Sequence, residues 1–132
     1  MTVRNYRDLQ VWQKAMDLVV DCYQLTYSFP KEELYGLTNQ VRRAAVSIPA
    51  NLAEGHSRFN KREFVQFIGI ATGSLAELET HLLIAMKLNY LDKSRTDPVL
   101  GKTDELARML KGLRNALRPT RLSQTQSLIP KP

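Results

Sequence analysis

A regular apolar stripe in the second half of the chain limits most strongly what this sequence can fold into. From Phe64 to Leu88, apolar side chains recur at steps of three and four residues, which is the spacing of one face of an α-helix. Asn60 precedes the stripe and Glu63 follows three residues later, a pattern typical of a helix start. The stripe therefore predicts a long amphipathic helix that ends near Asn89 and consists of Phe64, Phe67, Ala71, Leu75, Leu78, Leu82, Ala85 and Leu88.

Small residues interrupt the interior of this predicted helix. They are Gly69, Ala71, Gly73, Ser74 and Ala76, and each glycine costs about 1 kcal/mol relative to alanine in a helix. Small side chains let two helix backbones come close together, so the sequence predicts a close helix approach along this segment.

Three further helices follow from the same periodicity. The first has the stripe Leu9, Trp12, Met16, Val19, Tyr23 and Tyr27. The second begins near Leu37 after Gly36, has the stripe Leu37, Val41, Ala44, Ile48 and Leu52, and is expected to stop at Gly55. The fourth is expected to have Asp97 as its cap, Pro98 in its first turn, Pro119 at its end and the stripe Val99, Leu106, Leu110, Leu113 and Leu117.

Four helices with short connections and no strand pattern predict an all-α protein, an antiparallel up-and-down four-helix bundle over residues 1–118. Residues 119–132 are polar, carry prolines and lack a period, so they are expected to form a disordered basic tail. Pro49 lies inside the second helix and removes the hydrogen bond that the Ala45 carbonyl would accept. A kink is therefore expected between Ser47 and Ala50, with Ser47 or water satisfying the carbonyl.

The net charge of +6 is concentrated at one end of the chain. Residues 106–132 carry six Lys or Arg and no Asp or Glu, whereas the charges nearly balance before that point. The asymmetry indicates an anionic partner, with a solvated basic surface as the alternative. The candidate nucleic-acid-binding residues of the fourth helix share one sector of about 120°, away from its apolar stripe, and are Arg108, Lys111, Arg114 and Arg118.

Arg42 and Arg43 lie off the apolar stripe of the second helix and are further candidates for nucleic-acid binding. Guanidinium groups match both carboxylates and phosphates. The two arginines therefore have three open roles: ion pairs with acids of a neighbouring helix or subunit, phosphate contacts, or simple exposure. The acids considered as partners are Glu54, Glu77 and Glu79.

The residues of catalysis and metal binding form no pattern in this sequence. The two histidines, His56 and His81, match no metal-ligand spacing, so neither a metal nor a cofactor is expected. Glu54, His56 and Ser57 are close in sequence, but a helix end explains them better than a nucleophile with its base. Cys22 is expected to be a buried thiol. The chain has no apolar run near 20 residues and no secretory signal, which predicts a cytoplasmic protein without a membrane partner.

Four stretches resemble the consensus of the 23S rRNA intervening-sequence protein family. They are LQVWQKAMDLVVDCYQLT, FPKEELYGLTNQVRRAAVSIPANLAEG, KREFVQFIGIATGSLAELETHLLIA and LNYL. The resemblance is close from Leu9 to Leu91 and looser afterwards. It implies a small cytoplasmic bacterial four-helix bundle that assembles as a ring-like homopentamer. It also points to a related group that serves as accessory proteins to the reverse transcriptases of diversity-generating retroelements.

Two classes of function follow from these observations. The first is a non-enzymatic module that binds RNA or DNA phosphates through the basic face of the fourth helix and the cations of the tail. The second is a homo-oligomeric scaffold that holds another protein, such as a reverse transcriptase.

Overall fold

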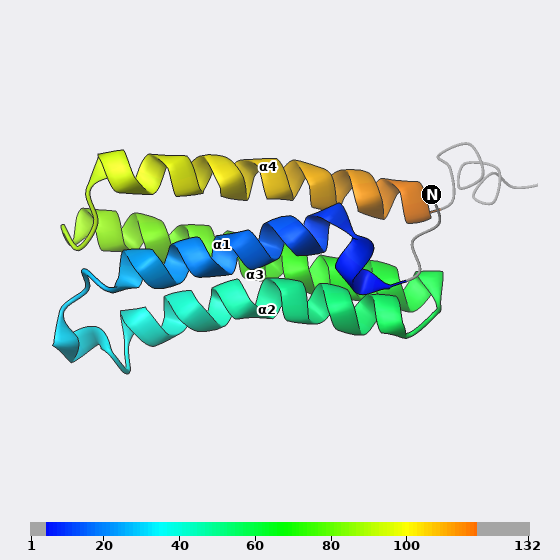
Figure 1. Cartoon of the computed structure of the whole chain (residues 1–132), viewed down its shortest axis with the longest axis horizontal. Coiled ribbons are helices and arrows are strands. Elements are labelled where there is room, and N and C mark those ends of the chain that lie inside the picture. The colour runs from blue at the N-terminus through cyan, green and yellow to red at the C-terminus, as the bar shows by residue number, and fades with distance from the viewer. Residues whose placement is uncertain (1–4, 119–132) are drawn as a thin grey trace, which may run out of the picture.

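Four long helices make up the part of the protein that the computed structural model describes, residues 5–118. They are α1 (Gln10–Thr26), α2 (Leu37–Ser57), α3 (Lys61–Lys87) and α4 (Lys93–Leu117), with short 3-10 turns at η1 (Tyr6–Asp8) and η2 (Lys31–Glu33). In Figure 1 the helices lie side by side, and the colour order reverses from each helix to the next, as in an up-and-down bundle. The all-α, four-helix prediction is confirmed. The predicted tail, residues 119–132, lies outside the described residues.

The core lies along the axis of the bundle and comes from all four helices. Each fully buried Leu or Ile contributes about 1.5–3 kcal/mol relative to exposure. The largest of these side chains are Leu18, Ile48, Leu52, Ile68, Leu75, Leu78, Leu82, Leu106 and Leu110. The stripe predicted for α2 is buried throughout, and the stripe predicted for α3 is buried except at Phe67 and Leu88.

The stripe predicted for α1 is shifted from the face that the structure buries. Met16 is 42% exposed and Tyr27 is 75% exposed. The buried residues of this helix are Val11, Ala15, Leu18, Cys22, Leu25 and Thr26. Because α1 carries apolar residues on two adjoining sectors, its periodicity alone does not select the inner one. Cys22 is buried as expected, and burial, with a smaller contribution from Asp21, raises its pKa to about 12.

Side-chain caps fix the starts of α3 and α4. Asn60 Oδ1 accepts a hydrogen bond from the Glu63 backbone N–H at 3.0 Å, which confirms the predicted start of α3. The prediction that Asp97 caps the fourth helix is wrong. Asp92 is the cap, its Oδ1 accepts from the Arg95 N–H at 2.8 Å, and Pro98 therefore lies inside α4. Two aspartates precede the same apolar stripe, and the earlier one captures the free backbone donor.

The second helix ends at Ser57, two residues after the Gly55 at which the stop was predicted to begin, and Gly55 itself is helical. Gly55 is buried, and a Cβ atom at this position would lie 2.5 Å from the Cβ of Phe67 and 3.1 Å from a ring carbon of Phe64. The glycine is thus needed for the close packing of α2 on α3. The chain turns instead after Ser57, where Phe59 adopts a left-handed backbone conformation with φ of 54°.

Pro49 lies within α2 and is buried. The hydroxyl of Ser47 is 2.8 Å from the hydroxyl of Ser74 on α3. The Asn51 amide donates to the Ser47 carbonyl at 2.8 Å and to its hydroxyl at 2.9 Å. This polar cluster ties α2 to α3 beside the proline. The kink between Ser47 and Ala50 stays a prediction.

The small residues of α3 divide between its two faces. Ala71 is buried, and Ser74 contacts α2, so these two allow the expected close approach. Gly69 and Gly73 face outward, and a Cβ atom at either would meet nothing within 4 Å. The prediction of a close helix approach is therefore wrong for these two glycines within the described chain.

The outer face of α3 is apolar as well as small. It exposes four large apolar side chains to between 41% and 50%: Ile70, Leu83, Ile84 and Leu88. Among the described residues, α3 is long and apolar enough to cross a membrane. Core helices of soluble proteins have the same length and composition, so this is only weak evidence for a membrane-spanning helix.

Candidate nucleic-acid interface

The four basic residues predicted on α4 occupy different environments. Lys111 and Arg118 are exposed, whereas Arg114 is half-buried, and its Nε atom has no hydrogen-bond partner within residues 5–118. Arg108 is exposed beside Glu105, and its charge helps to lower the pKa of that carboxyl. The positive charge of Arg108 is thus partly offset, while Lys111, Arg114 and Arg118 continue along one face toward the end of the helix.

The structure adds two cations from α3 that the sequence analysis missed. Because α4 ends beside the start of α3, Arg118 and Leu117 line a hollow of about 500 Å³ together with Lys61 and Arg62. Val65 and Gln66 complete the lining, so no acid takes part in it. The adjacent Lys-Arg pair directly after the Asn60 cap was the available signal.

We call these cations the basic patch: Lys61, Arg62 and Arg118 line the hollow, and Lys111 and Arg114 lie on the same face of α4 as Arg118. Among the described residues none of the five belongs to an ion pair. Exposed cations without a neutralising carboxylate create a positive potential that attracts anions from solution.

The side of α4 that faces α1 has paired charges. Lys14 Nζ lies 2.9 Å from Glu105 Oε1, and Lys102 Nζ lies 2.7 Å from Asp21 Oδ2. The Lys14 hydrogen bond is the main cause of the lowered pKa of Glu105, and the Asp21 hydrogen bond is the main cause of the raised pKa of Lys102. The charge on this side is therefore balanced within the protein.

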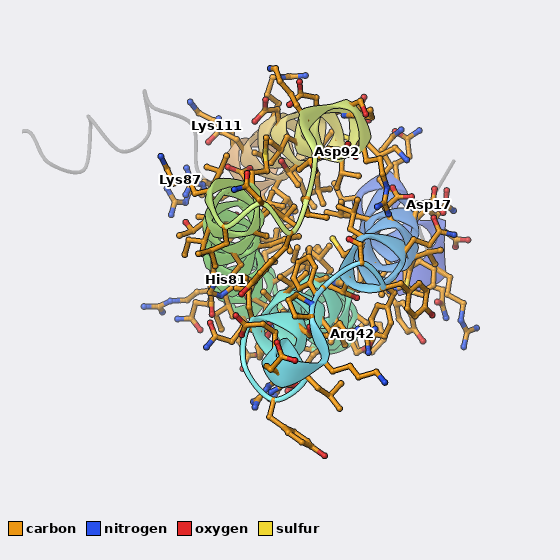
Figure 2. All side chains as sticks on the ribbon, turned by 90° about the vertical axis from the view of Figure 1, so that its left-hand side faces the viewer. Asp17, Arg42, His81, Lys87, Asp92 and Lys111 are labelled. Carbon is orange, nitrogen blue, oxygen red and sulfur yellow. The ribbon has the colours of Figure 1, made fainter. Side chains whose placement is uncertain are left out.

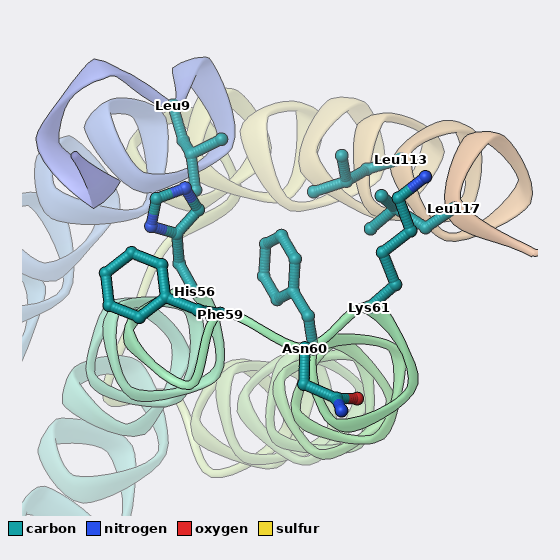
Figure 3. Close-up of a pocket in the computed structure, with 8 residues that line it drawn as sticks. Leu9, His56, Phe59, Asn60, Lys61, Leu113 and Leu117 are labelled. Atoms are coloured by element: carbon teal, nitrogen blue, oxygen red, sulfur yellow. The ribbon is translucent and has the colours of Figure 1, made fainter. Parts of the chain in front are cut away.

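An apolar hollow of about 350 Å³ adjoins the basic patch at the same end of the bundle. Figure 3 shows Leu113 and Leu117 of α4 on one side of the hollow, with Lys61 reaching toward Leu117. The remaining lining is Leu9, His56, Phe59, Asn60 and Phe64. Lys61 and Leu117 line both hollows, so cations and apolar surface are continuous here.

Arg42 and Arg43 do not join the basic patch. In the end-on view of Figure 2, Arg42 and Lys111 lie on opposite sides of the bundle, with the helices and core between them. The six residues predicted from sequence therefore belong to two surfaces. They were assigned together because sequence reveals which residues leave the core but not the direction in which each helix faces.

Two of the three acids considered as partners of Arg42 and Arg43 have other contacts. Glu54 pairs with Arg58 at 3.0 Å, and Glu77 Oε1 lies 3.4 Å from His81 Nε2. In the described part of the chain neither Arg42 nor Arg43 belongs to an ion pair.

The remaining chemistry-bearing residues do not assemble into a reactive centre over residues 5–118. His56 packs edge-on against Phe64 with ring centroids 5.6 Å apart, which gives it a structural contact at the end of α2. No group of three or more His, Cys, Asp or Glu side chains in this range could hold a metal ion.

Comparison with known proteins places the fold. A crystal structure of a protein of unknown function from the S23 ribosomal protein family of Bacteroides thetaiotaomicron is similar, with a TM-score of 0.71 and 19% sequence identity. The similarity covers 79% of this chain and 97% of that chain. The comparison with curated proteins yields no match. The family model described as 23S rRNA-intervening sequence protein matches residues 7–112, and Arg114 and Arg118 lie just beyond this range. The chain therefore belongs to the 23S rRNA-intervening sequence protein family.

Proposed function

We propose that this protein is a non-enzymatic nucleic-acid-binding module that contacts the phosphates of RNA or DNA through the basic patch. The observation that carries the proposal is the set of five cations without an ion pair among the described residues, gathered from α3 and α4 at one end of the bundle. Phosphate contacts by Lys and Arg release counterions, which drives binding without regard to sequence.

The shape of the patch suits a phosphate backbone better than a small ligand. Its members lie along the surface of two helices, and the hollow between Lys61, Arg62 and Arg118 is open and not lined by acids. Arg118 and Arg62 offer forked donors, while Lys61 and Lys111 act as mobile point charges. Such a surface favours affinity over base recognition.

We further propose that the protein works as a homo-oligomer, with the outer face of α3 as the contact. Ile70, Leu83 and Ile84 are each 41–50% exposed, and the outward Gly69 and Gly73 leave room for a second backbone. The resemblance to the family implies a ring-like homopentamer. A ring would repeat the basic patch and so strengthen binding to a long polyanion.

The same apolar face supports a second candidate function, a protein scaffold. A helix face that exposes four large apolar side chains is also suited to hold another protein. In this alternative the protein is an accessory subunit and its partner is a reverse transcriptase, as the resemblance implies for a related group.

Binding to a fluorescent oligonucleotide tests the first proposal. The parent protein should bind with a dissociation constant of about 10⁻⁶ M at low salt, a value typical of sequence-independent binding. Changing the four cations Lys61, Arg62, Lys111 and Arg118 to Gln should weaken binding by at least about tenfold, with helical content unchanged. Absence of binding by the parent at low salt would reject the proposal and favour the scaffold.

Light scattering tests the assembly. The parent should have the mass of an oligomer, and Ile84→Asp should dissociate it because a carboxylate would be buried in the contact. Asn115→Asp, an exposed change on α4, is the matched control and should leave the mass unchanged. A parent that stays monomeric at high micromolar concentration would contradict the proposal.

A further inference from the structure

A second surface, between α1 and α2, has a different chemistry from the basic patch. A hollow of about 460 Å³ is lined by Tyr23 of α1 and by five residues of α2, which are Asn39, Arg42, Arg43, Val46 and Ser47. The lining contains two arginines, an aromatic ring and two neutral polar groups, and no acid. It lies on the side of the bundle opposite Lys111 (Figure 2).

Arg42 is held in place by aromatic rings. Its guanidinium carbon lies 4.6 Å from the centroid of the Tyr23 ring and 5.6 Å from that of Tyr27. Its Nε atom donates to Thr26 Oγ1 at 3.0 Å, and the Thr26 hydroxyl donates to the Tyr23 carbonyl at 2.8 Å. The side chain is therefore preorganised, and its terminal nitrogens have no hydrogen-bond partner among the described residues.

Two apolar side chains at this hollow are open to solvent. Val46, in its lining, is 43% exposed, and Tyr27, which lies outside the lining but beside the Arg42 guanidinium, is 75% exposed, although an aromatic ring gains most from burial. Arg43 is exposed beside Arg42. An exposed ring next to an ordered guanidinium offers a flat surface for stacking, and the neighbouring cation can hold a phosphate.

We propose that the hollow lined by Tyr23, Arg42 and Arg43, together with the neighbouring ring of Tyr27, binds an unpaired nucleotide of single-stranded nucleic acid, with the base stacked on Tyr27 and the Arg42 guanidinium and the phosphate on Arg43. The inference deepens the proposed nucleic-acid binding and rests on it. Stacking needs a free base face, which a strand supplies when its bases are unpaired and a duplex does not. The basic patch would then hold the backbone, and this hollow would select for single strands.

The test compares two exposed tyrosines. Tyr27→Ala should weaken binding to a single-stranded oligonucleotide by about tenfold, in line with the loss of one stacked base, and leave binding to a duplex of the same length unchanged. Tyr27→Phe keeps the ring and should bind like the parent. Tyr35→Ala removes a 91% exposed ring that does not contact Arg42, so it should leave both affinities unchanged.

The outcomes separate this inference from the proposed function. If Tyr27→Ala binds the single strand as tightly as the parent, or weakens single-strand and duplex binding equally, the stacking site is wrong, while loss of binding in the Gln variant of the basic patch still supports the patch. If an acidic peptide of equal charge displaces the single strand from the parent but not from Tyr27→Ala, the hollow binds carboxylates, and the inference is overturned. Circular dichroism and light scattering of each variant show whether fold and assembly are retained.

Discussion

The two sides of α4 show how one helix can use the same residue types for different purposes. Toward α1, Lys102 and Glu105 are engaged with Asp21 and Lys14 at 2.7 and 2.9 Å, so the charges cancel within the bundle. Toward α3, Lys111 and Arg118 have no such partners among the described residues, and Arg118 lines a hollow with Lys61 and Arg62. The comparison teaches that net charge alone does not locate a binding surface, because only the cations without partners attract an external anion.

The packing of α2 on α3 helps to hold the start of α3, which carries Lys61 and Arg62 of the basic patch. Gly55→Ala places a Cβ atom 2.5 Å from the Cβ of Phe67 and should destabilise the protein by about 1–3 kcal/mol. Gly73→Ala meets no atom within 4 Å and should instead stabilise the monomer by about 0.5–1 kcal/mol. Urea unfolding of both variants measures the difference. Equal effects of the two changes would mean that Gly55 is not a packing requirement.

The bundle itself could be predicted from sequence because periodicity depends only on neighbours along the chain. The stripes of α2 and α3 and the Asn60 cap are local patterns, and the structure contains them. Asp97 was mistaken for the cap because Asp92 offers the same chemistry five residues earlier. When two aspartates fit the cap pattern equally well, only the tertiary packing decides which of them caps the helix.

The candidate site depends on contacts between segments far apart in sequence, so only its three members on α4 could be predicted. Lys111 and Arg118 were found because they share a face of one helix. Lys61 and Arg62 were missed because they join the patch only when α3 and α4 lie antiparallel. For Arg42 the sequence left an ion pair, a phosphate contact and simple exposure open, and its contact with Tyr23 was not foreseen because the sequence does not reveal which residues of α1 face α2.

Removing the acids on the side of α4 that faces α1 should abolish the difference between its two sides. Asp21→Asn together with Glu105→Gln releases Lys102 and Lys14 from their ion pairs and should make the α1 side of α4 a second anion-attracting surface. Affinity for an oligonucleotide at low salt should rise several-fold. Fluorescence anisotropy measures this, and Glu32→Gln with Asp8→Asn supplies a control of equal charge away from these pairs. An equal rise in both double variants would indicate that only net charge matters.

A smaller effect is expected for the pH dependence of stability. The folded protein holds the pKa of Glu105 below its unfolded value, mainly through the Lys14 hydrogen bond. This pair therefore stabilises the fold above the unfolded pKa of the carboxyl, and the stabilisation is lost as the pH falls through the lower folded pKa. The melting temperature of the parent should fall by a few degrees more between about pH 6 and pH 3 than that of Glu105→Gln. Parallel curves for the two proteins would show that the ion pair adds nothing.

The salt dependence of nucleic-acid binding tests the central claim most directly. Two double variants lower the net charge by the same amount, Lys111→Gln with Arg118→Gln in the basic patch and Lys14→Gln with Lys102→Gln on the paired side. The slope of the logarithm of the association constant against the logarithm of salt concentration should become shallower by about 1 for each phosphate that the protein no longer neutralises. We predict a slope shallower by about 2 for the patch variant and a slope like that of the parent for the paired-side variant. Equal slopes for the two double variants would contradict the assignment of binding to the basic patch.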